Sequence, residues 1–179
     1  MKKVTFGLIV CIVMSSGIDA QAHDLPSAGS ESKGWKYVGA HWSGTSTKYF
    51  EATSDTWEAR FLKGVNKFEK ESDDKFSISK VSVGKSENFI ESYSSKSATW
   101  VARRTFYSTS KDHPQRWRIQ FNSAKEAESW TTVSAHEIGH VFGLADLYEE
   151  KNNGKLMFGE DNGTRTMQKS DKTGFNYIY

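Results

Sequence analysis

The residues that most restrict how this chain can fold are 136–140, which read H-E-I-G-H. At 3.6 residues per turn, positions four apart lie about 40° apart around a helix, so a helix brings His136 and His140 to one face. Gly143 follows three residues after the second histidine and can adopt the positive φ that ends a helix abruptly. The pattern therefore predicts a helix that carries both imidazoles on one side and ends in a sharp turn.

Two imidazoles on one face of a helix are suited to hold a zinc ion, whose Zn–N bonds are about 2.0–2.1 Å long. The sharp exit at Gly143 can swing Asp146 back toward the same ion, and a carboxylate is an accepted zinc ligand. We therefore expect His136, His140 and Asp146 as the metal ligands. Glu137 points about 100° away from His136, which suits it to accept a proton from water at the open position of the ion. Glu137 is the expected general base.

Hydrophobic periodicity predicts three helices, over residues 55–71, 123–142 and 168–179. The first has its apolar positions at helical spacing: Trp57, Phe61, Val65 and Phe68. Each of the first two opens on the residue pair of a capping box, Asp55 with Glu58 and Ser123 with Glu126. The motif therefore lies near the end of the second helix.

Three or four strands are expected between the first two helices. Residues 99–107 fit a strand, and 116–121 fit one better, with Trp117, Ile119 and Phe121 on one face. Near residues 76–83 the apolar alternation changes phase, which predicts a bulge at Ser79–Lys80. A further strand is expected over 35–42. This order of elements predicts one α+β domain.

The N-terminus has the features of a signal peptide over residues 1–22. Two lysines precede an apolar run over 4–14, and Ala20-Gln21-Ala22 fits the small-x-small cleavage rule. The apolar run is shorter than the ~20 residues that span a bilayer. We expect secretion, no membrane anchor after cleavage, and a flexible leader or short propeptide over 23–34.

Composition excludes several other classes of protein. A formal charge of +2 from 24 basic and 22 acidic residues, without long runs of one sign, gives no footprint for nucleic acid. The single cysteine, Cys11, lies in the predicted signal peptide, so the secreted chain would hold no disulfide and no thiol-based latency switch. The 179 residues suggest one domain, and we expect a monomer.

Residues 130–179 resemble the metzincin zinc endopeptidases. From 136 to 146 the chain follows the pattern HExxHxxGxxD, with Asp146 where most metzincins carry a third histidine. The snapalysin type of small secreted bacterial protease also has aspartate at this place. Val133-Ser134-Ala135 and Asp146-Leu147-Tyr148 agree with that type as well.

The resemblance extends toward the C-terminus. Residues 155–159 look like the methionine turn of metzincins, which implies that Met157 forms the floor beneath the metal. The ending over 170–179 is similar to the last helix of matrixin catalytic domains. The resemblance implies a zinc metalloprotease catalytic domain over 35–179. Its fold would be a twisted, mostly parallel sheet with an antiparallel edge strand, a backing helix, the active-site helix and a small irregular C-terminal subdomain.

The activity that the resemblance implies is hydrolysis of peptide bonds in extracellular proteins. Glu137 would accept the proton of the attacking water and return it to the leaving amine. A protein or peptide substrate would lie extended along an edge strand, which we expect from residues 99–110.

Other interpretations of the same residues stay open. Glu160 is a rival third ligand if it lies on a helix, although the glycines in residues 158–163 disfavour one. His41 and His113 are expected to be structural. A structural calcium ion stays open at two acidic loops, Asp73–Asp74 and Asp161–Asn162. The alternative function is a secreted zinc-stabilised binding protein or an inactive protease homologue. Glu137 argues against it, because structural zinc has no need of a general base.

Overall fold

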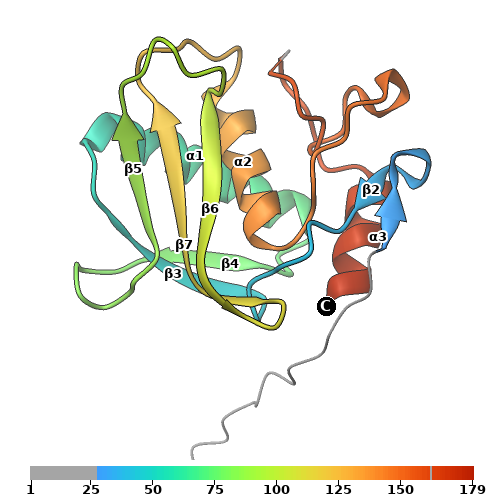
Figure 1. Ribbon diagram of the computed structural model, residues 1–179, viewed down its shortest axis with the longest axis horizontal. Helices are drawn as coiled ribbons and strands as arrows, with labels where there is room; N and C mark the ends of the chain where they lie inside the picture. The colour runs from blue at the N-terminus through green and yellow to red at the C-terminus, as the bar shows by residue number, and fades with distance from the viewer. Residues whose placement is uncertain (1–27, 162) are drawn as a thin grey trace, which may run out of the picture.

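A computed structural model describes residues 28–161 and 163–179, so the predicted signal peptide and the first part of the leader, 23–27, lie outside the described residues (Figure 1). Its main sheet has five strands in the order β4-β3-β5-β7-β6. The strands are β3 (Ser46–Glu51), β4 (Ser77–Lys80), β5 (Phe89–Tyr93), β6 (Ala102–Ser110) and β7 (His113–Asn122). The helices are α1 (Asp55–Glu71), α2 (Trp130–Val141) and α3 (Lys169–Ile178).

The sheet has the mixed topology that was predicted. Strands β4, β3, β5 and β7 run parallel, and β6 pairs antiparallel with β7. Among the described strands, β6 has a neighbour on one side only, so it is the antiparallel edge strand of a mostly parallel sheet. The α+β fold class is confirmed.

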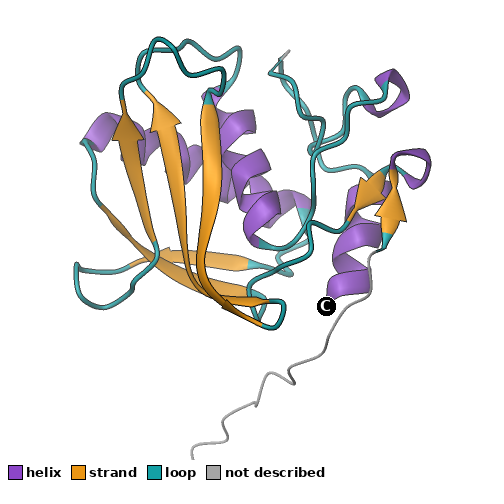
Figure 2. Ribbon diagram, viewed as in Figure 1, coloured by secondary structure: helices purple, strands orange, loops and turns teal. Residues whose placement is uncertain are grey.

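Helices α1 and α2 lie side by side on one face of this sheet, with the aromatic core between the layers (Figure 2). Helix α1 has the predicted bounds, and the four apolar residues at helical spacing, Trp57, Phe61, Val65 and Phe68, are all buried. The predicted capping box at its start is absent. Ser54 precedes the helix without a side-chain cap, and the Glu58 carboxylate instead pairs with Lys80 at 2.5 Å.

The predicted start of the motif helix is wrong. Helix α2 begins at Trp130, where the Ser129 hydroxyl accepts a hydrogen bond from the Thr132 amide at 3.2 Å. Residues 123–129 form a loop instead. The Asn122 side-chain oxygen accepts hydrogen bonds from the backbone amides of Ser95 and Ala124, and these bonds turn the chain there.

Some strands also differ from expectation. No bulge occurs near residue 79 in the described chain; β4 ends at Lys80, a turn follows, and Val83 is 75% exposed. The sequence pattern did not single out β3 or β5. Over 35–42, only β2 (Trp35–Lys36) is a strand, and it pairs with β1 (Gly29–Ser30).

The described part of the expected leader belongs to the folded unit. Residues 28–34 supply β1 and the short helix η1 (Glu31–Lys33). The Glu31 carboxylate accepts hydrogen bonds from the amides of Tyr148 and Glu149 and from the Asn152 side chain, at 2.7–3.2 Å. These bonds hold the segment against the C-terminal part of the chain.

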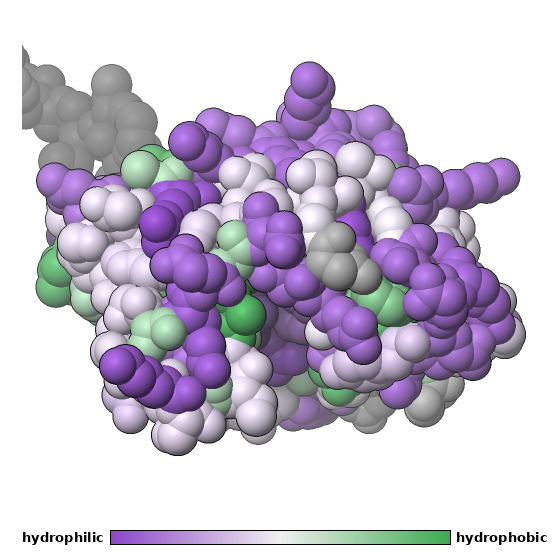
Figure 3. Space-filling view, turned by 90° about the horizontal axis from the view of Figure 1, so that it is seen from above, coloured by the Kyte–Doolittle hydropathy of each residue, from purple (hydrophilic) through white to green (hydrophobic). Residues whose placement is uncertain are grey.

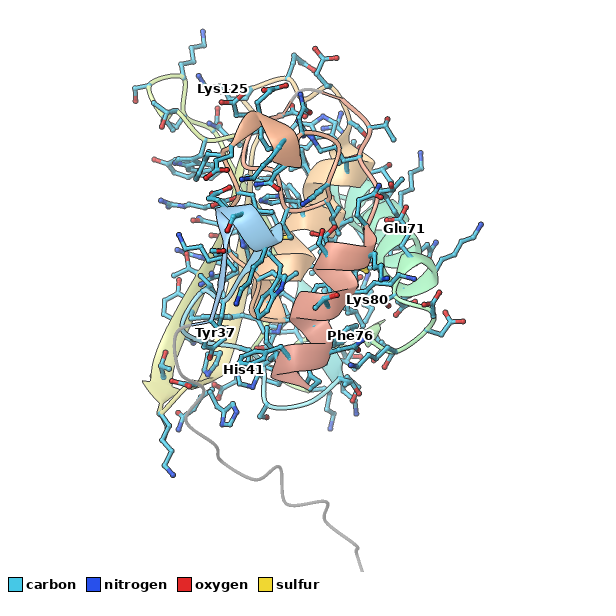
Figure 4. The ribbon with its side chains drawn as sticks, turned by 90° about the vertical axis from the view of Figure 1, so that its right-hand side faces the viewer. Tyr37, His41, Glu71, Phe76, Lys80 and Lys125 are labelled. Carbon is cyan, nitrogen blue, oxygen red and sulfur yellow. The ribbon has the colours of Figure 1, made fainter. Side chains whose placement is uncertain are left out.

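The C-terminal segment after α2 is irregular until α3, as predicted. The Glu71 carboxylate of α1 accepts a hydrogen bond from the Met167 amide of this segment at 2.8 Å. Phe76, which follows α1, packs against Phe175 of α3 (Figure 4). None of the described helices has the length and apolar character needed to cross a membrane.

Candidate metal centre

The histidines of the motif lie on α2 and face the same carboxylate. The Nε2 atoms of His136 and His140 lie 3.0 and 3.4 Å from Oδ1 of Asp146. The turn after the helix brings this aspartate back. Gly143 has φ +101°, and the Leu144 amide bonds to the Gly139 carbonyl at 3.1 Å, so the chain reverses within a few residues.

Backbone carbonyls fix the protons of both imidazoles. Nδ1 of His136 lies 2.9 Å from the Leu156 carbonyl, and Nδ1 of His140 lies 2.7 Å from the Leu144 carbonyl. A carbonyl only accepts, so each Nδ1 donates and each neutral ring turns the lone pair of Nε2 toward Asp146. Two nitrogen lone pairs and a carboxylate oxygen thus point at one another without a hydrogen-bond donor among them. Such an arrangement of electron-rich atoms is stabilised by a proton or a metal cation between them.

The electrostatics of the metal-free site agree with this geometry. Burial lowers the pKa of His136, but the Asp146 and Glu137 carboxylates outweigh it, so the pKa is raised overall. Burial raises the pKa of Asp146, but the hydrogen bonds and positive charge that His136 and His140 supply when they are protonated on Nε2 bring it well below its usual range. We therefore expect these atoms to share a proton when no metal is bound. Two imidazoles and a carboxylate with one side open are also a donor set that suits a catalytic zinc ion.

Glu137 lies beside these metal-ligating atoms, and its side chain is buried, with the residue 5% exposed. The ligand atoms of His136, Glu137 and His140 all lie within 4.8 Å of one another. Its Oε2 is buried and has no hydrogen-bond partner among the residues of the described chain. A buried, unpartnered carboxylate oxygen is costly for stability, so this arrangement indicates a role in binding or chemistry rather than in packing.

Met157 lies under α2, as the methionine turn implies. It is 1% exposed, and a Cβ added to Gly139 would lie 2.4 Å from its Sδ atom. The Leu147 amide bonds to the Met157 carbonyl at 2.9 Å, which joins this turn to the residue after Asp146. The methionine therefore supports the helix between the two histidines from below.

A cleft of about 760 Å³ opens over the site. The start of β6 and the residues before it line one side, and the C-terminal segment lines the other. Figure 3 looks down on this end of the molecule and shows a largely hydrophilic surface that is hollowed between these two sides. The floor residues are His136, Glu137, His140 and Asp146.

The other candidate residues lie apart from the metal donors. Glu160 lines the cleft, but its carboxylate is not among the clustered ligand atoms of the described chain, and its carbonyl accepts a hydrogen bond from Arg165. His41 and His113 face each other with their Nε2 atoms 3.2 Å apart, and Nδ1 of His41 lies 3.1 Å from the Tyr37 hydroxyl (Figure 4). This second cluster links the β6–β7 turn to the segment after β2.

Sequence reasoning missed Arg104 and left Tyr148 as a structural residue, and both line the cleft. Tyr148 is 62% exposed and packs its ring over Gly159. Strand alternation could have found Arg104, because Ala102, Arg104 and Phe106 share one face of the predicted strand.

Comparison with known proteins assigns the chain to no family. No protein-family model matches the chain, and no curated protein matches it. Among solved structures, the chain is similar to high choriolytic enzyme 1, a hatching-enzyme zinc protease of the medaka fish Oryzias latipes. The match has 12% identity and a TM-score of 0.44, and covers 78% of this chain and 94% of that one. At this TM-score the likeness adds nothing to the chemistry of the site, which rests on the chain's own residues.

Proposed function

We propose that the protein is a secreted zinc-dependent endopeptidase of the metzincin type, with residues 35–179 as its catalytic domain. One observation carries the proposal: two imidazole lone pairs and the Asp146 carboxylate converge, with no donor between them, beside the buried Glu137. The cleft above them runs past the edge strand β6, which leaves room for an extended chain.

His136, His140 and Asp146 would hold the zinc ion. When bound, zinc supplies a Lewis acid that lowers the pKa of water and polarises a carbonyl. Glu137 would accept the proton of the attacking water and pass it to the leaving amine. Its Oε2 has no partner in the described structure to compete for that proton.

The edge strand supports a peptide as the substrate. The outer side of β6 has no neighbour among the described strands, and its start borders the cleft directly above α2. An extended peptide can add to such an edge through main-chain hydrogen bonds and so place one bond over the metal. These bonds do not depend on side chains, which fits a protein substrate.

The finer assignments belong to the same proposal. Aspartate at position 146 supports the snapalysin type, and α3 lies where the matrixin-like ending was expected. Residues 1–22 support secretion through their signal-peptide pattern.

The test is cleavage of casein and a mixed peptide library by residues 23–179 loaded with zinc. We expect cleavage that a chelator abolishes and that added zinc restores. One tightly bound zinc ion with no cleavage of any substrate would instead support the alternative, a zinc-stabilised binding protein or inactive homologue.

A further inference from the structure

We propose that Arg104 binds a carboxylate of the substrate, so that the enzyme prefers peptides with an anionic group close to the cleaved bond. This inference rests on the proposed function and names the substrate class of that site. Nothing in the metal donor set requires Arg104, so its role is separate from metal binding.

The register of the sheet turns Arg104 toward the site. On β6, Ala102, Arg104 and Phe106 are paired with Phe121, Ile119 and Trp117 of β7. These three β7 residues are 0–1% exposed and face the helix layer. Paired positions in a sheet point to the same face, so Arg104 points toward α2. Its side chain lines the cleft together with His136 and Glu137.

The guanidinium of Arg104 has no polar partner within residues 28–161 and 163–179. Its Nε is buried and unpaired, and its guanidinium carbon lies 4.0 Å from the centroid of the Phe106 ring. Two neighbouring arginines have polar partners: Arg103 donates to Gln120 at 2.8 Å, and Arg118 pairs with Glu91 at 3.2 Å. Arg116 also has a buried, unpaired Nε, but it lies on the opposite face of the sheet, away from the cleft. A half-buried cation without a partner is costly, and a ligand that supplies a partner relieves that cost.

The charges around Arg104 favour an anion once the metal is present. Burial lowers the pKa of Arg104, and the nearby carboxylates of Glu137 and Asp146 oppose this shift. A divalent ion compensates both of these carboxylates, which leaves Arg104 as one uncompensated positive charge beside the cleft. Arg165, across the cleft, differs because Asp161 and Glu160 lie close enough to stabilise its charge.

The geometry of the group indicates which anion fits. A planar guanidinium can donate two parallel hydrogen bonds to a carboxylate, and the Phe106 ring beside it does not compete for them. That carboxylate is either an aspartate or glutamate side chain or the C-terminal group of the peptide. The chemistry is the same, and matched peptides separate the two sources.

The test uses zinc-loaded protein and peptides that place Glu or Gln at each position flanking the cut, each with a free or an amidated C-terminus. We expect kcat/KM for the best Glu or free-carboxylate peptide to exceed that of its neutral match. Arg104→Met should remove this preference, with a loss of about 10- to 100-fold on the anionic peptide and little change on the neutral one. Arg104→Lys should keep part of the preference.

The control is Arg116→Met. Arg116 lies on β7 beside Trp117, faces away from the helices, and holds its guanidinium 4.4 Å from the Tyr107 ring. It should leave the preference unchanged. An anionic preference that persists in Arg104→Met would overturn the proposal, because another positive group at the cleft, such as the metal, Arg103 or Arg165, would then bind the carboxylate. An equal loss on anionic and neutral peptides would also overturn it.

Binding separates this inference from the proposed function. Fluorescence anisotropy of the same peptides on zinc-loaded Glu137→Ala should show the anionic preference without any turnover, and adding Arg104→Met should abolish it. Absence of cleavage by the unmutated protein, together with an Arg104-dependent preference in binding, would refute the peptidase and leave the carboxylate site standing. Binding that does not distinguish the peptides would refute the carboxylate site alone.

Discussion

At the scale of single residues, the site is defined by where its protons lie. Backbone carbonyls accept hydrogen bonds from Nδ1 of His136 and His140, so the lone pair of each Nε2 faces Asp146. The two Nε2 atoms lie 3.0 and 3.4 Å from Oδ1 of Asp146. The sequence motif predicted which side chains meet. It could not predict the two carbonyls, because the first belongs to Leu156, twenty residues away on a loop without periodicity.

This proton arrangement predicts a pH dependence. In the metal-free protein the pKa of His136 is raised above its ordinary 6.5, so its contribution to stability is full below about 6.5 and is lost as the pH rises through the folded value. The pKa of Asp146 is lowered from 3.8, so its contribution is full above 3.8 and is lost as the pH falls through the folded value. The pair therefore stabilises the metal-free fold most between about pH 3.8 and 6.5.

Zinc competes with that proton, so its effect should have the opposite trend. We expect the increase in Tm on adding zinc to be small near pH 5 and to grow toward pH 8. The measurement is thermal unfolding with and without zinc across this range. A zinc-induced increase that is the same at every pH would contradict the shared proton.

At the scale of elements, the contact between α2 and the methionine turn beneath it is the part most sensitive to a single substitution. Gly139→Ala adds a methyl group 2.4 Å from Sδ of the buried Met157, so the methionine must move. We expect a loss of about 1–3 kcal/mol in the free energy of unfolding and weaker zinc binding. Chemical denaturation and chelator competition measure the two effects. Unchanged zinc affinity would show that Met157 does not support the metal ligands.

The N-terminal segment predicts a second effect of this kind. The Glu31 carboxylate accepts hydrogen bonds from the backbone amides of Tyr148 and Glu149, which lie in the loop that directly follows Asp146. Glu31→Ala removes these bonds, and each kcal/mol lost should lower Tm by about 2–4 °C in a chain of this size. Zinc should also dissociate faster, which stopped-flow transfer to a chelator would measure. Lys33→Ala, in the same short helix, is the matched control.

Element prediction succeeded where periodicity was strong. The bounds of α1 follow from apolar residues at helical spacing, and β7 follows from Trp117, Ile119 and Phe121. The start of α2 was wrong because the Asn122 side chain, rather than a capping box, organises the chain at residues 123–129. Strand β5 was missed because only Ile90 in it is buried, so it shows no alternation.

At the scale of the whole molecule, the cleft comes from parts that are distant in sequence. The edge strand β6, helix α2 and the C-terminal segment border it, and Figure 1 shows that segment beside β1 and β2. The Tyr37–Leu144 bridge and the Glu31 contacts join the first described residues to the loop of Asp146. No local pattern encodes such pairings, so the sequence predicted that His136, His140 and Asp146 come together but not the walls of the cleft or Arg104.

The central claim is that Glu137 moves the proton while the two histidines and Asp146 hold the metal. The most direct measurement is zinc content and peptide turnover of Glu137→Ala beside the unmutated protein. We predict one zinc ion per chain in both, a Tm that does not fall, because the variant loses a buried and unpaired carboxylate oxygen, and a fall in kcat of about 10²- to 10⁴-fold in the variant. A variant that keeps its zinc and most of its turnover would contradict the account.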